Sequence, residues 1–170
     1  MYKTLLSGMT ACLVICSATI VPSAPIDQPF VSIIREAGAL VLEIAQTDDR
    51  LDVAFHLSSD KKVTDQELAH LAGAEGIYSL NLRGTEVTDA GVEHLRGLDS
   101  LVQLHLEMTT VGDQALALVS ELGNLEYLNV YGTNVTDAGL KHLEGLTSLR
   151  DLNLAGITNV TDVGLEHLKG

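Results

Sequence analysis

Apolar residues follow a fixed pattern that repeats every 24 or 25 residues along most of the chain. In each repeat two apolar positions flank one other residue, and this alternation predicts a short strand with one buried face. The apolar pairs are Leu80 and Leu82, Leu104 and Leu106, Leu128 and Val130, and Leu152 and Leu154. Apolar residues at every third position then follow, as in Leu140, Leu143 and Leu146, and predict a short helix that faces the strands.

A Val-Thr-Asp phrase marks the start of each predicted helix. It recurs at residues 63–65, 87–89, 111–113, 135–137 and 160–162, with glycine in place of threonine at residue 112. Threonine is a good N-cap, and the aspartate places negative charge in the first helical turn. We expect Gly73, Gly97 and Gly145 to end helices in the left-handed conformation. A period of this length predicts a solenoid, because no single repeat can bury its own apolar face.

Two long phrases carry a family resemblance, GTEVTDAGVEHL at residues 84–95 and GTNVTDAGLKHL at residues 132–143. With a leucine three positions before each strand, they resemble the leucine-rich repeats of planctomycete and related bacterial proteins. More distantly, they resemble the Cys-containing repeats of F-box adaptor proteins. The resemblance covers roughly residues 52 to 170. It implies an α/β leucine-rich-repeat solenoid with a short curved parallel sheet, one short helix per repeat and a binding role without shared catalytic residues.

The sequence divides into three predicted parts. Residues 1–24 form a candidate signal peptide, residues 25–57 an N-terminal cap with the first strand, and residues 58–170 the repeat solenoid. In the cap, residues 29–37 predict a helix that Gly38 ends. Residues 40–44 and 51–57 predict a hairpin that covers the first repeat.

The first 24 residues predict export. No charged residue lies between Lys3 and Asp27, and small residues near position 24 offer cleavage sites. Two alternatives stay open, an uncleaved membrane anchor and lipidation at Cys16. All three place the protein in the periplasm, the cell envelope or the medium. Because both cysteines, Cys12 and Cys16, lie in this segment, the remaining chain has no disulfide or thiolate chemistry.

The net charge of the chain argues against a nucleic-acid partner. The chain has 10 Lys and Arg against 23 Asp and Glu, which gives a net charge of −13. Nucleic-acid binders carry charge of the opposite sign. We therefore expect no nucleic-acid partner, and membrane contact only through the N-terminal segment if it is not cleaved.

Two polar columns have the composition of metal ligands but not the spacing. The histidine column is His70, His94, His142 and His167. Neighbouring helices lie about 8–10 Å apart, too far for two imidazoles to share a zinc ion. The aspartate column offers one carboxylate per helix start, whereas Ca²⁺ needs about 6–8 oxygens. We expect no metal, no cofactor and no enzymatic activity, because the known catalytic motifs are missing as well.

The outward side chains of the strands are the candidate binding residues. Alternation predicts three columns on a concave face. They are Ala54, Ser79, Gln103, Tyr127 and Asp151; His56, Asn81, His105, Asn129 and Asn153; and Ser58, Arg83, Glu107, Tyr131 and Ala155. Recurring asparagine suits a structural polar ladder, whereas two tyrosines on one exposed strand favour an interface. The predicted partner-binding residues are Arg83, His105, Glu107, Tyr127, Asn129 and Tyr131.

These patterns predict a non-enzymatic module that recognises an unidentified protein or peptide through its concave strand face. A solvated polar face without a ligand is the plainer reading. The alternative function is structural, a module that self-associates or docks through its C-terminal edge. Leu165 and Leu168 lie on the last predicted helix with no strand after it, so we expect a monomer or a weak homodimer through that edge.

Overall fold

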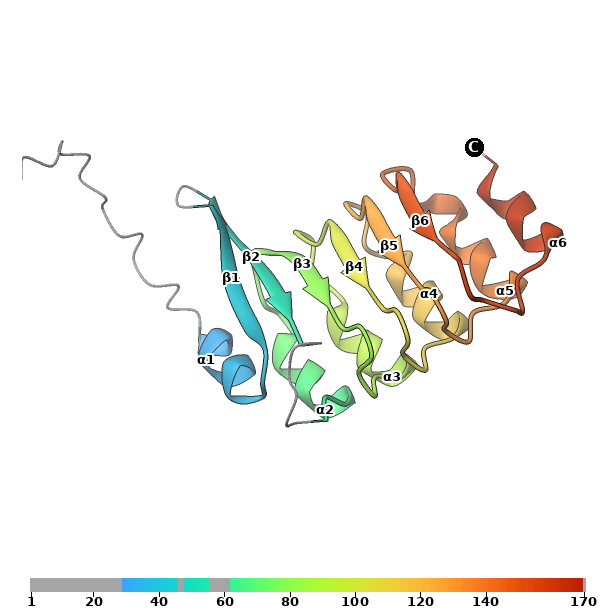
Figure 1. The fold of residues 1–170 in the computed structure, drawn as a ribbon. Helices are drawn as coiled ribbons and strands as arrows, with labels where there is room; N and C mark the ends of the chain where they lie inside the picture. The colour runs from blue at the N-terminus through green and yellow to red at the C-terminus, as the bar shows by residue number, and fades with distance from the viewer. Residues whose placement is uncertain (1–28, 46–47, 56–61, 170) are drawn as a thin grey trace, which may run out of the picture.

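The computed structural model of the protein describes residues 29–45, 48–55 and 62–169. In these ranges six strands form one sheet in chain order, β1-β2-β3-β4-β5-β6, and the helices cover one of its faces (Figure 1). The β1–β2 pair is antiparallel and the later pairs are parallel. The fold is the predicted α/β leucine-rich-repeat solenoid. The candidate export signal lies outside the described residues, and within them no helix is long and apolar enough to cross a membrane.

Each repeat supplies one strand and one short helix. The strands of the repeats are β3 (Ile77–Asn81), β4 (Gln103–His105), β5 (Tyr127–Asn129) and β6 (Asp151–Asn153). The helices are α2 (Asp65–Leu68), α3 (Asp89–Val92), α4 (Asp113–Val119), α5 (Asp137–Leu140) and α6 (Asp162–Leu165). All but α4 continue into a 3₁₀ turn, at Ala69–Leu71, Glu93–Leu95, Lys141–Gly145 and Glu166–Leu168.

A helix and a hairpin close the N-terminal end of the sheet. Helix α1 (Pro29–Glu36) buries Val31 and Ile34. The hairpin consists of β1 (Leu40–Ala45) and β2 (Asp48–Ala54), and β2 also pairs with β3. This arrangement joins the cap directly to the first parallel strand.

The register of β2 corrects the first predicted column. Asp52 pairs with Ser79, and Ala54 pairs with Asn81, so the placement of Ala54 beside Ser79 is wrong by two residues. A register shift between Leu51 and Asp52 contributes one of these two residues, and strict alternation from the repeats does not reveal it. His56 and Ser58, the other first-strand members of the columns, lie outside the described residues.

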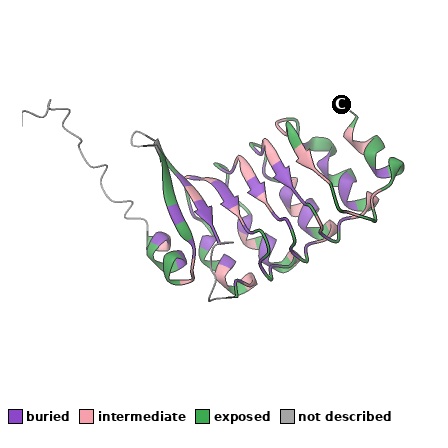
Figure 2. Ribbon diagram, in the orientation of Figure 1, coloured by how far each residue is buried: buried purple, intermediate pink, exposed green. Residues whose placement is uncertain are grey.

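The core is one aliphatic layer between the sheet and the helices. Leu80, Leu104 and Leu128 have no exposed surface, as the predicted strand faces require. The same continuous cluster extends from the cap to the fifth helix. Figure 2 shows that burial decreases toward the C-terminal end, where Leu152 and Leu154 of the last repeat are half-buried.

The recurring aspartates connect each repeat to the next one. Oδ1 of Asp113 accepts a hydrogen bond from the backbone N–H of Thr136 at 2.8 Å, and its Oδ2 accepts one from the Thr136 hydroxyl at 2.7 Å. Asp65 binds Thr88 in the same way, and Asp137 binds Thr161. We call this series the aspartate ladder. Local sequence predicted the threonine caps, but not that each aspartate caps the following helix.

The first repeat replaces the ladder with a contact of its own. No repeat precedes Thr64 in the described chain, and Oε2 of Glu67 accepts from the Thr64 N–H at 2.7 Å and from its hydroxyl at 2.8 Å. This is the predicted capping box. One glutamate oxygen thus accepts the two hydrogen bonds that the two oxygens of an aspartate accept in the ladder.

Glycine is needed where the ladder passes the next helix. A Cβ on Gly139 would lie 2.3 Å from Oδ1 of Asp113, and Gly91 and Gly164 have the same close approach. The third repeat instead has Gly112 and Ala115, whose backbone N–H groups donate to Oδ1 of Asp89 at 2.6 and 3.2 Å. Because Gly112 has no hydroxyl, these bonds to Asp89 come from backbone N–H groups alone.

One predicted helix end differs from the structure. Gly73 and Gly97 have φ of 75° and 79°, as the left-handed ends require. Gly145 is not in the left-handed region, because the 3₁₀ turn Lys141–Gly145 continues through it. The prediction for Gly145 is therefore wrong.

The ladder predicts that Gly139→Ala is destabilising although alanine is the better helix former. The new Cβ displaces the Asp113 carboxylate, and losing its hydrogen bonds should lower the free energy of unfolding by about 1–3 kcal/mol. Urea unfolding followed by circular dichroism measures this. Gly123→Ala is the matched control, since a Cβ there meets nothing within 4 Å. Equal stability of the two variants would contradict the close approach.

The ladder also predicts acid sensitivity. Hydrogen bonds from the hydroxyl and N–H of Thr161 hold the pKa of Asp137 below its ordinary value of 3.8. Burial raises the pKa of Glu67, but the bonds from Thr64 outweigh it and hold that pKa below 4.5. A carboxylate with a lowered folded-state pKa stabilises the fold above its unfolded-state pKa, and this contribution is lost as the pH falls through the folded value.

We therefore expect the free energy of unfolding to fall between about pH 5 and pH 2, and Asp137→Asn to reduce that fall. Urea titrations across this range test the expectation. The control is Glu75→Gln, which removes one exposed carboxylate outside the ladder. An Asp137→Asn profile parallel to that of the unaltered chain would argue against a stabilising carboxylate at this position.

Candidate functional site

The candidate site lies on the face of the sheet turned away from the helices, which we call the strand face. Because side chains alternate along a strand, the polar residues between the buried leucines share this face. The register aligns Ser79, Gln103, Tyr127 and Asp151 in one row, and Asn81, His105, Asn129 and Asn153 in the next. These alignments match the predicted columns from β3 onward.

The asparagines of the second row have a local structural role. Oδ1 of Asn81 accepts from the backbone N–H of Arg83 at 3.1 Å. Asn129 and Asn153 accept in the same way from the residues two positions on, at 3.1 and 3.0 Å. Each asparagine therefore stabilises the end of its own strand through these bonds. His105 is the exception in the row.

A polar cluster forms around His105. Oε1 of Glu107 accepts from Nδ2 of Asn129 at 2.7 Å and lies 3.1 Å from Nδ1 of His105. Nδ2 of Asn129 also donates to the Tyr127 hydroxyl at 3.2 Å. The rings of His105 and Tyr127 contact each other at a centroid distance of 4.8 Å. Four of the six predicted residues therefore touch one another.

Burial within the cluster differs from the expectation of an exposed face. Glu107 is only 8% exposed and Asn129 only 7%. They are covered because neighbouring strands bring large side chains against them, which alternation within one strand does not predict. Oε2 of Glu107 is buried without any hydrogen-bond partner among the described residues. Of the other predicted residues, Arg83 and Tyr131 are exposed.

Met108 is a site candidate that the sequence analysis missed. It has a φ of 57°, in the left-handed region, and its side chain is 58% exposed. The equivalent residues of the other repeats are Gly84, Gly132 and Gly156, with φ between 65° and 71°. A non-glycine residue in this conformation is strained, and such strain is typical of functional positions. Comparison of the repeats at this column would have revealed the substitution.

A second missed feature is apolar and lies at the N-terminal edge of the strand face. Leu40, Leu42 and Ile44 of β1 are 40–51% exposed. Leu42 and Ile44 help to line a shallow hollow of about 270 Å³ that reaches Gln103 of β4. The alternation of Leu40, Leu42 and Ile44 with Val41 could have predicted an apolar outer face.

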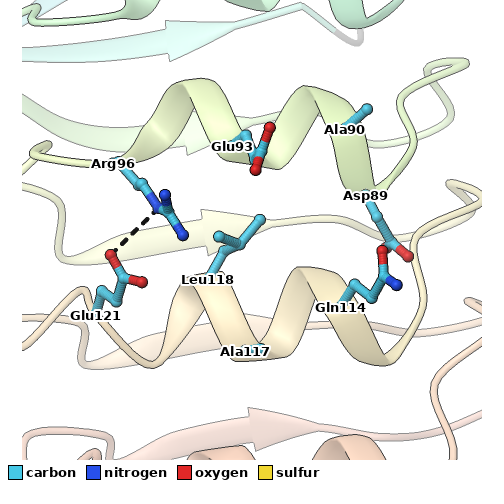
Figure 3. Close-up of a pocket in the computed structure, with 8 residues that line it drawn as sticks. All are labelled: Asp89, Ala90, Glu93, Arg96, Gln114, Ala117, Leu118 and Glu121. Atoms are coloured by element: carbon cyan, nitrogen blue, oxygen red, sulfur yellow. Dashed lines mark ion pairs between the residues drawn. The ribbon is translucent and has the colours of Figure 1, made fainter.

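The opposite side of the solenoid carries a groove between α3 and α4 (Figure 3). Its volume is about 400 Å³, and Leu118 points into it where other repeats have histidine. The ion pair between Arg96 Nε and Glu121 Oε2, at 3.3 Å, crosses one end. Its polar residues already include a bonded ladder aspartate, Asp89, and this pair.

Neither the histidine nor the aspartate column gathers into a metal site. Among the described residues, no group of three or more His, Cys, Asp or Glu side chains is placed to hold a metal ion. His167 instead contacts Glu144 of the preceding repeat through its Nδ1. The aspartate oxygens accept backbone and hydroxyl hydrogen bonds in the ladder.

Comparison with known proteins gives no family for this chain. No protein-family description and no curated protein matches the sequence. Among solved structures, an internalin (inlF) from Listeria monocytogenes is similar over 64% of this chain, with 21% sequence identity and a TM-score of 0.45. The match spans only 37% of that internalin. The assignment to leucine-rich repeats accordingly depends on the repeats and the sheet of this chain.

Proposed function

We propose that this chain is a non-enzymatic recognition module that binds a peptide or protein segment through its strand face. The observation that carries the proposal is the pair of exposed side chains Met108 and Tyr131, which lie on adjacent strand ends. The backbone N–H of Met108 donates to the carbonyl of Tyr131 at 2.9 Å. Exposed methionine and tyrosine on adjacent strand ends favour a protein interface, because they bury a large area with adaptable contacts.

The scaffold supports this function in two ways. The aspartate ladder and the aliphatic core hold the strands rigidly. Binding a segment therefore costs little conformational entropy in the strand face. The apolar edge at Leu40, Leu42 and Ile44 adds a second contact area on the same face. An extended segment crossing the strands would meet the apolar edge at one end and the tyrosines at the other.

The cellular setting is part of the same proposal. The first 24 residues support export, with the anchor and lipidation alternatives unchanged. The resemblance to planctomycete-type repeats supports a bacterial envelope or secreted protein. Both stay predictions from the sequence.

The test is selection of binding peptides from a random displayed library against the full chain. Affinities of the selected peptides are then measured for the unaltered chain and for Tyr127→Ala with Tyr131→Ala. If both tyrosines are hot spots, each replacement should cost about 2 kcal/mol of binding free energy. Circular dichroism should stay unchanged.

Leu118→Ala is the control for this experiment, because it alters the groove between α3 and α4 and leaves the strand face intact. Peptides that bind the tyrosine variant at full affinity would remove the strand face from consideration. Peptides weakened only by Leu118→Ala would place binding on the helices instead.

Self-association through the C-terminal edge is the second candidate. Val163 is 68% exposed and Leu165 43% exposed, next to a hollow of about 360 Å³ lined in part by Leu149, Leu152 and Leu168. A second copy covering this surface would bury these side chains. The net charge of −13 opposes such a contact.

Sedimentation velocity over a range of concentrations tests this candidate. We expect a monomer, or a weak dimer that Leu165→Glu abolishes and high salt strengthens, since salt screens the repulsion. Amide exchange of residues 162–168 should slow with concentration if the dimer forms. A dimer that Leu165→Glu leaves intact would exclude this edge.

A further inference from the structure

The third repeat departs from the others at two positions of the strand face near its carboxyl end. His105 stands in the asparagine row, and Met108 stands in the left-handed glycine column. Between them lies Glu107, the buried carboxylate of the polar cluster. Repeats under purely structural constraint keep the same residues, so these departures indicate a role that the neighbouring repeats lack.

Glu107 is incompletely bonded for a buried carboxylate. Its Oε1 has two neighbours, Nδ2 of Asn129 and Nδ1 of His105, whereas its Oε2 has no donor. A buried acceptor without a partner is destabilising, and a buried negative charge more so. The fold does not require a carboxylate here, because the equivalent position in the next repeat is Tyr131. A ligand that donates a hydrogen bond to Oε2 would remove the destabilisation.

We propose that His105, Glu107, Met108, Asn129 and Tyr131, the third-repeat cluster, form a subsite for a basic side chain, arginine or lysine, of a bound peptide segment. The inference rests on the proposed function, because it assumes that the segment binds across the strand face. The guanidinium or ammonium group donates to Oε2 of Glu107. The aliphatic part of the same side chain packs against Met108 and the ring of Tyr131, which also offers a cation–π contact.

The electrostatics of the chain favour this ligand over an acidic or neutral one. A net charge of −13 attracts basic segments and repels acidic ones at every distance within the screening length. Oε2 is covered in the unbound chain, so binding involves a change of rotamer within the cluster. Such side-chain changes are common at interfaces whose backbone stays fixed.

Defined probes test the subsite without a known partner. The full chain, labelled with ¹⁵N, is titrated with N-acetyl-arginine N-methylamide, its lysine analogue and the neutral isostere N-acetyl-citrulline N-methylamide. The reporter is the side-chain amide of Asn129, which contacts Glu107 directly. We expect the basic probes to shift this signal with an affinity about 10- to 100-fold above that of citrulline.

Variants distinguish binding of the probe at the subsite from its nonspecific electrostatic attraction to the acidic chain. Glu107→Gln should reduce binding of the arginine probe to the level of citrulline, whereas Glu93→Gln, an equal change of charge on the helix side, should leave it unchanged. Met108→Gly restores the residue of the other repeats and relieves its strained φ, so it should fold well and still weaken the probe. This variant keeps the test valid if Glu107→Gln does not fold.

Two outcomes overturn the inference. One is equal affinity for the arginine and citrulline probes, including no detectable binding of either. The other is binding that shifts only residues of α3 and α4. The peptides selected on the strand face distinguish the two proposals. If they bind through Tyr127 and Tyr131 but tolerate replacement of their basic residues, the subsite fails and the recognition function stands; if they do not depend on the tyrosines, both fail.

Discussion

The hydrogen bonds from each threonine cap to the aspartate of the preceding repeat are the contact on which the solenoid depends. Asp113 and Thr136 are 23 residues apart in sequence, yet two bonds of 2.7 and 2.8 Å join them. These bonds hold neighbouring helix starts together, while the backbone hydrogen bonds of the sheet set the spacing of the strands. The requirement for glycine at Gly139 follows, because the carboxylate occupies the space of a side chain. Short helices that would be unstable alone are thereby held in register.

A scaffold fixed in this way lets one repeat differ without losing the fold. The third repeat keeps its buried Leu104 and Leu106 and its ladder contact through Asp89, while its strand face carries His105, Glu107 and Met108. The strain at Met108 and the unpartnered oxygen of Glu107 are tolerated because the surrounding repeats determine the backbone. Sites that recognise a ligand commonly combine a rigid scaffold with locally destabilising features such as these.

The sequence predicts the local features of this fold well, and the features that need neighbouring repeats poorly. Strand faces, threonine caps and the N-terminal hairpin follow from alternation and helix-capping rules within one segment. The hydrogen bonds of Asp113 to the next repeat do not follow from these rules, because they depend on how closely two repeats stack. The burial of Glu107 likewise depends on Asn129 from the next strand. Met108 was within reach of the sequence, since the glycine column marks it as an exception.

The two ends of the ladder differ in how completely their side chains are bonded and packed. At the first repeat Oε2 of Glu67 accepts both hydrogen bonds from Thr64, so that threonine is bonded as fully as those of the ladder. At the last described repeat Leu152 and Leu154 are half-buried and Val163 is exposed, so packing there is loose. The third-repeat cluster lies between these ends, with paired strands on both sides. A polar subsite needs fixed positions for its donors and acceptors, and the interior repeats of the described chain favour such a site more than its edges do.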